Sequence, residues 1–146
     1  MRLQIYWTGK SKDPAVALWT AEYLKRISRF AAIAAEPIPA REAANDAGLL
    51  RRAAQQHARL VLLDPAGRRL DSPQFAAFLE HSFAQDGRVL ALAIGGPEGF
   101  SAAARAAAFA RLSLSPMTYS HELARAMLLE QLYRALTLLH HHPYPR

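Results

Sequence analysis

The sequence predicts an α/β fold in which helices cover both faces of a mainly parallel sheet. Segments of strand character alternate with segments of helical periodicity along the 146 residues. The run from Val89 to Ile94 is apolar throughout, and such strands are typical of sheets buried on both faces. With 51% apolar residues and no linker, repeat or low-complexity segment, we expect a single domain over residues 1–146.

The first strand and helix are recognised by the residues at their ends. Residues 2–8 mix β-branched, aromatic and apolar side chains and stop at Gly9, which indicates a strand running into a turn. Asp13 and Pro14 then predict a helix start, because aspartate is a good cap and proline suits the first helical position. We expect this helix to reach Arg29 with an apolar face of Ala17, Ala21, Leu24 and Ile27.

The middle of the chain repeats this alternation. A strand over 33–38, a helix over 42–57 and a strand over 59–64 are predicted, the last ended by Pro65-Ala66-Gly67. Ser72 and Pro73 form a second cap-and-proline start, for a helix to about residue 85. Its apolar residues recur at helical spacing, namely Phe75, Phe78, Leu79 and Phe83.

The C-terminal part supplies the remaining elements. We expect a strand over 88–94, a loop over 95–99, a helix over 101–109, a strand over 110–114 and a final helix over 121–139. Apolar residues surround most of the final helix, which is typical of a helix buried on more than one side. The sheet is one expected cover, and a second subunit is a candidate for the other.

Composition narrows the possible functions. The 18 Lys and Arg outnumber the 12 Asp and Glu, and nearly all the excess is Arg, whose planar fork suits phosphate. A polyanionic partner is one interpretation, and an ordinary basic protein is the other. The absence of cysteine excludes a disulfide framework and a thiol nucleophile. Without a signal-peptide pattern or an apolar run near the roughly 18 residues of a membrane helix, we expect a cytoplasmic protein with no membrane association.

The glycine-rich segment Ile94-Gly95-Gly96-Pro97-Glu98-Gly99 is the strongest local candidate for a ligand site. It follows an apolar strand and precedes a helix capped by Ser101, and ligands of open α/β sheets bind at such strand ends. Its spacing matches neither a Walker A loop nor GxGxxG, so phosphate binding lacks support. A tight turn between strand and helix is the alternative.

A second candidate is the loop from Ser115 to His121, which also lies between a strand and a helix. The whole candidate segment runs from Leu112 to His121. Its apolar residues and small polar groups suit an adenosine-like ligand, and an ordinary loop with Ser120 as a helix cap is the alternative. The tail His140 to Arg146 carries groups that stack on bases or pair with phosphates, although a disordered terminus is also compatible. Three adjacent histidines rarely point at one ion, so we expect no metal site.

Individual catalytic residues are weakly indicated by the sequence alone. No nucleophilic triad is supported, because a serine, a histidine and an aspartate occur in most proteins. His121 is a candidate base, with a structural role as the alternative. Glu130 is unusual within an apolar helix, and an ion pair with Arg125 or Arg134 is its structural interpretation.

Several short segments, taken in chain order, form a pattern that extends from the first residues to the tail. They are Met1 to Ile5, Glu22 to Arg26, Leu62 to Asp64 with Gly67, Ile94 to Gly99, Leu112 to Ser115, Met117-Thr118 with His121, Glu130 to Ala135, and His142 to Tyr144. Together these segments resemble one family, the ribosomal RNA large-subunit methyltransferase H family of the SPOUT class. Members of this family use S-adenosyl-L-methionine to methylate N3 of a pseudouridine in 23S rRNA.

The resemblance implies a SPOUT fold, in which the C-terminal segment threads a loop to form a trefoil knot, an exception to the rule against knots. It also implies a homodimer that acts on 23S rRNA within the ribosome. The cofactor would lie against residues on three segments of the chain. They are Leu63, Gly96, Ser115, Pro116, Met117, Thr118, Tyr119 and Ser120.

The resemblance further places His121, Tyr144 and Arg146 near the target base, with the tail reaching the partner subunit's cofactor. Methyl transfer to N3 requires loss of an imide proton, so a base or a group that stabilises the anion is needed. His121 is the first candidate base and Glu130 the second, whereas Arg146 suits a phosphate or the developing negative charge.

Three other functions are compatible with the sequence. The chain is also interpretable as a SPOUT methyltransferase for another RNA, such as tRNA, which the identity of the methylated RNA would reveal. A non-catalytic RNA-binding module would bind RNA without methyl transfer. A flavodoxin-like nucleotide-binding protein would show flavin colour or fluorescence.

Overall fold

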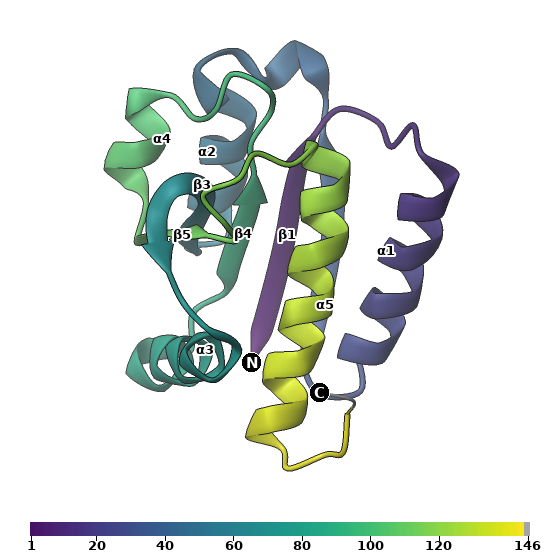
Figure 1. Ribbon diagram of the computed structural model, residues 1–146. Helices are drawn as coiled ribbons and strands as arrows, with labels where there is room; N and C mark the ends of the chain where they lie inside the picture. Colours follow the sequence, from purple (N-terminus) through teal and green to yellow (C-terminus); the bar gives the residue numbers. More distant parts are fainter. Residues whose placement is uncertain (145–146) are drawn as a thin grey trace.

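The computed structural model describes residues 1–144 and contains one parallel sheet, with strand order β2-β1-β4-β3-β5 (Figure 1). Every strand pair is parallel, which confirms the predicted α/β fold. The strands are β1 Arg2–Thr8, β2 Ala32–Ile38, β3 Arg59–Arg69, β4 Leu90–Ile94 and β5 Ala110–Ser113. The helices are α1 Pro14–Ile27, α2 Ala47–Gln55, α3 Ser72–Asp86, α4 Ala102–Ala107 and α5 His121–Leu139.

Helices cover both faces of the sheet, as predicted. All five residues of β4 are buried, and its alternate side chains point to opposite faces. Leu90, Leu92 and Ile94 join a core with α1, α3 and α5, whereas Ala91 and Ala93 join a smaller core with α2 and α4. In Figure 1, α5 runs across the front of the sheet between α1 and α3.

The prediction of a helix over 42–57 is wrong at its start, because α2 begins only at Ala47. Two short 3₁₀ turns, Ala40–Glu42 and Ala44–Asp46, precede it. Asn45 and Asp46 have positive φ angles of 53° and 56°. Left-handed backbone breaks a helix, and Asn and Asp are among the residues that tolerate it best.

The apolar face predicted for α1 is confirmed at Leu24 and Ile27 and wrong at its two alanines. Its buried residues are Val16, Thr20, Tyr23 and Ile27, while Ala17 and Ala21 are exposed. The hydroxyl of Thr20 is satisfied within the helix, because it donates to the Val16 carbonyl at 2.7 Å. A threonine whose hydroxyl is hydrogen-bonded within its own helix can be buried. Hydrophobic periodicity counts threonine as polar, and it therefore placed the alanines, not Thr20, on the buried face.

Helix caps follow the predicted chemistry with one correction. Asp13 and Ser120 cap α1 and α5, each accepting a backbone N–H in the first helical turn. The cap of α3 is Asp71, not Ser72, since the Asp71 carboxylate accepts the Gln74 N–H while the Gln74 side chain accepts the Asp71 N–H. This reciprocal capping box satisfies the backbone N–H groups of Asp71 and Gln74, while the Ser72 hydroxyl donates to Gln131.

Strand β3 continues past the point where the sequence predicts its end. Leu112 of β5 pairs with Leu63 and also with Arg68, and Ser113 pairs with Arg69. A strand residue can pair with one neighbouring strand on each side. Because Leu112 pairs with both parts of β3, these two parts lie on opposite sides of β5. We call residues 64–67 the arch.

The arch passes close to the β5 backbone. A Cβ atom on Gly67 would lie 2.8 Å from the carbonyl carbon and oxygen of Arg111, so only glycine fits there. In this arrangement the two parts of β3 and the arch enclose β5. A trefoil knot requires such an enclosed segment, and the knot itself stays a prediction. Within residues 1–144, no helix has the length and apolar character to cross a bilayer.

Candidate active site

A cavity of about 540 Å³ lies at the C-terminal ends of β3 and β4, beside the loop that follows β5. Its walls come from three segments that the sequence singled out separately. It contains seven of the eight predicted cofactor residues together with the candidate base: Leu63, Gly96, Ser115, Met117, Thr118, Tyr119, Ser120 and His121. Pro116, the eighth, is exposed and does not line the cavity.

The glycine loop forms one wall, and its glycines have different roles. A Cβ atom on Gly95 would lie 3.2 Å from the Phe100 ring, so this glycine permits close packing beneath the loop. Gly96 faces open space, with no heavy atom within 4 Å of a Cβ placed there. Gly99 has a φ of +74°, and its N–H donates to the Gly96 carbonyl at 3.0 Å, which closes a turn. The loop therefore leaves Gly96 open to the cavity.

Hydrogen bonds to the left-handed residues before α2 anchor the end of the glycine loop. The Ser101 N–H donates to the Asp46 carboxylate at 2.6 Å, and the Ser101 hydroxyl donates to the Asn45 carbonyl at 3.1 Å. The backbone strain at Asn45 and Asp46 thus positions two acceptors against the start of α4. No pattern in the sequence indicates that these residues support the candidate site.

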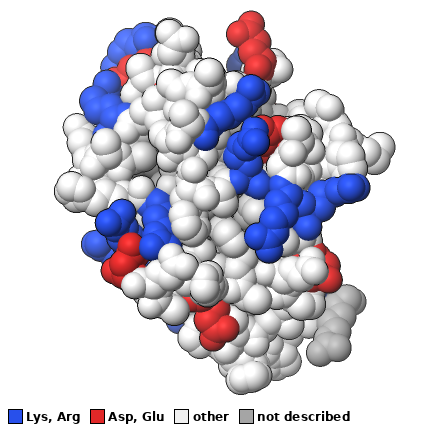
Figure 2. All heavy atoms as spheres, turned by 90° about the vertical axis from the view of Figure 1, so that its left-hand side faces the viewer, with Lys and Arg blue, Asp and Glu red and all other residues white. Residues whose placement is uncertain are grey.

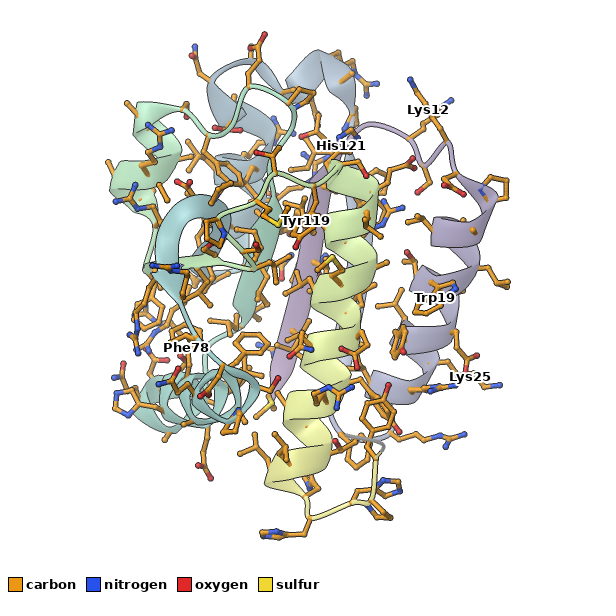
Figure 3. The ribbon with its side chains drawn as sticks, viewed as in Figure 1. Lys12, Trp19, Lys25, Phe78, Tyr119 and His121 are labelled. Atoms are coloured by element: carbon orange, nitrogen blue, oxygen red, sulfur yellow. The ribbon has the colours of Figure 1, made fainter. Side chains whose placement is uncertain are left out.

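The loop between β5 and α5 forms the opposite wall. The Ser115 hydroxyl accepts the Met117 N–H at 3.1 Å, and Ser120 caps α5. Met117 is 71% exposed, while Tyr119 and His121 are half-buried at the N-terminal end of α5 (Figure 3). His121 therefore lies at the edge of the cavity, accessible to a molecule that approaches from solvent.

Two charged residues complete this cavity. The Asp64 carboxylate lies 3.8 Å from the Arg111 guanidinium and 4.0 Å from that of Arg105. Its other oxygen accepts the Ala66 N–H at 2.9 Å. Arg105 lines the cavity but was not predicted, because no local pattern in the sequence indicates this position.

Tyr144 lies away from the cavity of its own chain. Its hydroxyl donates to Glu130, at the middle of α5, at 3.3 Å and lies 3.2 Å from the Tyr23 hydroxyl. Burial, together with these two neighbours, raises the pKa of Tyr144. Since α5 rises about 1.5 Å per residue, this contact lies about 13 Å along the helix from His121. Arg146 lies outside the described residues.

Glu130 also lies outside the first cavity, nine residues or about 13 Å along α5 from His121. Its carboxylate lies 2.6 Å from the Arg134 guanidinium, which matches the structural interpretation of this residue.

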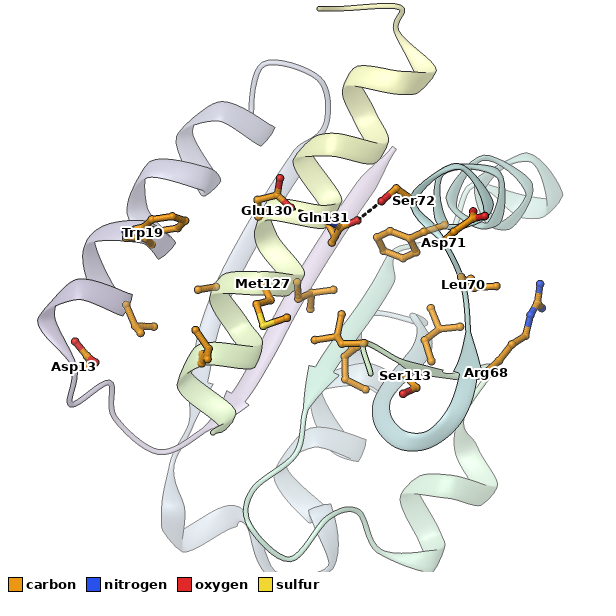
Figure 4. A pocket seen from close by; sticks show the side chains of 18 of the residues that line it. Asp13, Trp19, Arg68, Leu70, Asp71, Ser72, Ser113, Met127, Glu130 and Gln131 are labelled. Carbon is orange, nitrogen blue, oxygen red and sulfur yellow. Dashed lines mark hydrogen bonds between the residues drawn. The ribbon is translucent and has the colours of Figure 1, made fainter. Parts of the chain in front are cut away.

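A second cavity of about 690 Å³ lies between α1, α3 and α5 (Figure 4). Large side chains such as Trp19, Leu70 and Met127 line it, and it shares Leu63 and Leu114 with the first cavity. Trp19 is 53% exposed and Leu123 46% exposed. Single exposed apolar residues are common, but a cluster beside an apolar cavity is typical of an interaction site.

Hydrogen bonds hold the 9–13 loop against the first turn of α5. This turn lies at the rim between the two cavities, because His121 lines the smaller one and Leu123 the larger. Glu122 accepts the backbone N–H groups of Lys12 at 2.6 Å and Asp13 at 3.3 Å, and the Lys12 hydrogen bond is the main cause that holds the pKa of Glu122 below its usual range. Arg125 is 1% exposed, donates to Ser11 and Thr20, and packs 4.2 Å from the Trp7 ring centre. Burial lowers the pKa of Arg125.

Residues 1–144 contain no group of three His, Asp or Glu side chains arranged to hold a metal ion. The cavity at the strand ends offers backbone groups, small hydroxyls and apolar walls, with His121, Arg105 and Asp64 among its ionisable side chains. Such a combination suits a small organic ligand with a polar edge.

Comparison with known proteins gives a consistent result over the whole chain. The family described as Predicted SPOUT methyltransferase matches residues 1–145. A protein named Ribosomal RNA large subunit methyltransferase H from Geobacter sp. (strain M21) is 40% identical, covering 99% of this chain and 98% of that protein. A protein of the same name from Koribacter versatilis is 40% identical, covering 99% of this chain and 97% of that protein.

A solved structure was also similar, at a lower level. The SpoU methyltransferase AviRb from Streptomyces viridochromogenes, in complex with the cofactor AdoMet, has a TM-score of 0.46 and 16% identity. The alignment covers 92% of this chain and 57% of that chain. This structural similarity is too low to support any conclusion beyond the one drawn from the family match over residues 1–145.

Proposed function

Because the chain belongs to the SPOUT methyltransferase family, we propose that it transfers a methyl group from S-adenosyl-L-methionine to N3 of a pseudouridine in 23S rRNA of assembled ribosomes. The observation that carries this proposal is the single cavity in which Leu63, Gly96 and the 115–120 loop meet His121. The names of the full-length relatives support large-subunit rRNA as the substrate class. A ribosomal substrate implies a cytoplasmic location.

The residues of this cavity fit the proposed cofactor. About 540 Å³ is within the usual range for a site that encloses a small organic molecule. Leu63, Ile94 and Leu114 supply apolar walls for an adenine ring, and Gly96 leaves its backbone accessible to polar groups. When bound, S-adenosyl-L-methionine supplies a methyl group activated by a positively charged sulfur.

His121 is the residue that we propose handles the proton. Its half-buried ring at the start of α5 borders both the cavity and solvent, where a base entering from RNA would meet it. A neutral imidazole accepts the N3 proton of the base, or an imidazole N–H donates a hydrogen bond to the deprotonated base and lowers the energy of this anion. The remaining contribution of the chain is alignment of the two reacting groups.

We also propose that the protein acts as a homodimer through the second cavity. Trp19 and Leu123 border an apolar surface of α1 and α5 that a second copy would cover. The Tyr144 hydroxyl contacts Glu130, about 13 Å along α5 from His121, so its proposed contact with substrate requires the cavity of the partner subunit. We propose that Arg146 acts in the same site.

The decisive experiment measures methyl transfer from radiolabelled S-adenosyl-L-methionine to three RNAs. We expect label in large ribosomal subunits that lack the modification, and none in tRNA or in protein-free rRNA. Mapping by nuclease digestion and mass spectrometry should place the methyl group on a pseudouridine. Label in tRNA alone would instead support the other SPOUT function.

The role of His121 is tested separately with His121→Ala and His121→Gln. We expect kcat to fall about 100-fold or more, as is usual for loss of a general base, with unchanged cofactor binding. His81→Ala on exposed α3 is the control for losing a histidine. Normal turnover by His121→Ala would exclude His121 as the base.

A further inference from the structure

One edge of the molecule concentrates arginine side chains around the arch. Arg68, Arg69, Arg105 and Arg111 are all exposed, and we call them the arginine edge. Figure 2 shows basic side chains gathered over the face that carries α4, β5 and the arch. They come from three elements that are separate in sequence and are brought together by the pairing of β3 with β5.

The charges of this edge are only partly balanced. Asp64 is the carboxylate that approaches the edge, at 3.8 Å from Arg111 and 4.0 Å from Arg105. Within residues 1–144, neither Arg68 nor Arg69 forms an ion pair with a carboxylate. By contrast, Arg26, Arg52 and Arg59 are each paired with an acidic residue. The edge therefore has positive charge available for an external anion.

The position of the edge connects it to the proposed chemistry. Arg105 lines the cavity that contains His121, and Arg68 lies on the arch side of the apolar cavity beside it, away from Trp19 (Figure 4). The backbone that carries Arg68 and Arg69 is paired to β5, so the two adjacent side chains project from opposite faces of a fixed strand. A polyanion lying along this edge would pass the mouth of the candidate active site.

We propose that the arginine edge binds the phosphate backbone of the RNA substrate and thereby holds the target base at the cavity. Guanidinium groups form paired hydrogen bonds with phosphate oxygens, and several of them spread over one edge match a chain of phosphates better than one small anion. Contacts of this kind fix register and orientation without reading sequence. This inference rests on the proposed function, because it assigns the RNA contact of that same site.

The test compares Arg68→Ala/Arg69→Ala with Lys25→Ala/Arg29→Ala, a pair of exposed cations of α1 and the turn after it. Both double variants remove two positive charges, so they separate the local contact from net charge. The probe is the large ribosomal subunit that lacks the modification, with binding to its rRNA measured by cosedimentation between 50 and 200 mM salt. Arg68→Lys/Arg69→Lys keeps the charge and tests the need for guanidinium.

We expect the Ala pair at the edge to weaken rRNA binding about tenfold or more, as for loss of charged hydrogen bonds. The slope of log affinity against log salt should become shallower by about 0.7 to 0.9 for each lost phosphate contact. The lysine pair should recover part of the affinity, and the α1 pair should bind like the parent protein. Equal binding by the edge and α1 variants, or no rRNA binding by the parent at 50 mM salt, would overturn the proposal.

Cofactor titration of the same proteins distinguishes this inference from the proposed function. Loss of rRNA binding with normal S-adenosyl-L-methionine binding supports the edge as the RNA contact. A parent protein that binds rRNA through the edge but does not bind the cofactor would refute the methyltransferase proposal and leave the RNA contact in place. Circular dichroism melting shows that each variant is folded.

Discussion

The two cavities share Leu63 and Leu114 but are built in different ways. The smaller cavity is formed by turns, glycines and small hydroxyl residues at strand ends, so backbone groups remain accessible to a ligand. The larger is formed by side chains such as Trp19, Leu70 and Met127 on helices and the strand-to-helix connection. The difference indicates that the first suits a small polar molecule and the second suits the apolar side chains of another protein surface.

The largest expected effect is the loss of cofactor binding in Gly96→Trp. Gly96 faces open space, so an indole should fill the smaller cavity without disturbing the fold. We expect affinity for S-adenosyl-L-methionine and S-adenosylhomocysteine to fall at least about 100-fold by isothermal titration, because the ring takes the place of the ligand. Ala103→Trp, on the exposed side of α4, is the control. Normal binding by Gly96→Trp would place the cofactor elsewhere.

The second cavity is tested by Trp19→Glu. If a second copy covers this surface, a carboxylate should weaken dimerisation about tenfold or more, because the charge would be desolvated in an apolar contact. Analytical ultracentrifugation of parent, Trp19→Glu and the control Ala103→Glu gives the dissociation constants. A parent protein that is monomeric at 100 µM would contradict the proposed dimer. Cofactor binding should survive in the monomer if the two cavities are independent.

A smaller effect is expected at the anchor of the glycine loop. Asp46→Ala removes the acceptor of the Ser101 N–H and places alanine in a left-handed conformation. We expect a loss of about 1–3 kcal/mol in the free energy of unfolding, measured with urea. Asp46→Asn keeps an acceptor and tolerates positive φ, so its loss should be smaller. Equal losses in the two variants would show that the carboxylate charge matters more than the hydrogen bond.

The smallest expected effect is a change of stability with pH at the rim between the cavities. Backbone hydrogen bonds from Lys12 and Asp13 lower the pKa of Glu122 in the folded protein. This stabilisation is present above the unfolded pKa of glutamate and is lost as pH falls through the lowered folded value. Urea denaturation between pH 6 and 3 should therefore show a weaker acid dependence in Glu122→Gln. Identical profiles would mean that the contact contributes nothing to stability.

Much of the smaller cavity was predictable, because its walls have local signals. Glycines after the apolar run ending at Ile94 and a serine cap before α5 mark strand and helix ends, where the fold places ligands. The family resemblance then joined these segments into one site. Arg105 and Asp46 were missed, since their roles depend on contacts between segments far apart in the sequence.

The arch and the α1 face were not predictable from local patterns. Pro65-Ala66-Gly67 is a sound signal for the end of a strand, and only pairing with β5 extends β3 to Arg69. The buried face of α1 includes Thr20, which a hydrophobic pattern excludes. The ends of helices and strands were thus predictable where local residues mark them. The prediction was wrong where pairing with a distant strand extends β3, and where a hydroxyl bonded within its own helix allows Thr20 to be buried.

The pairing of one strand around another also sets an order of assembly. Residues 59–63 pair with β4, but residues 68 and 69 gain their partners only when residues 112 and 113 have arrived. A chain emerging from its N-terminus during synthesis therefore completes the arch late. Both cavities require residues beyond β5, so neither the ligand-sized space nor the apolar surface exists until nearly the whole protein has been made.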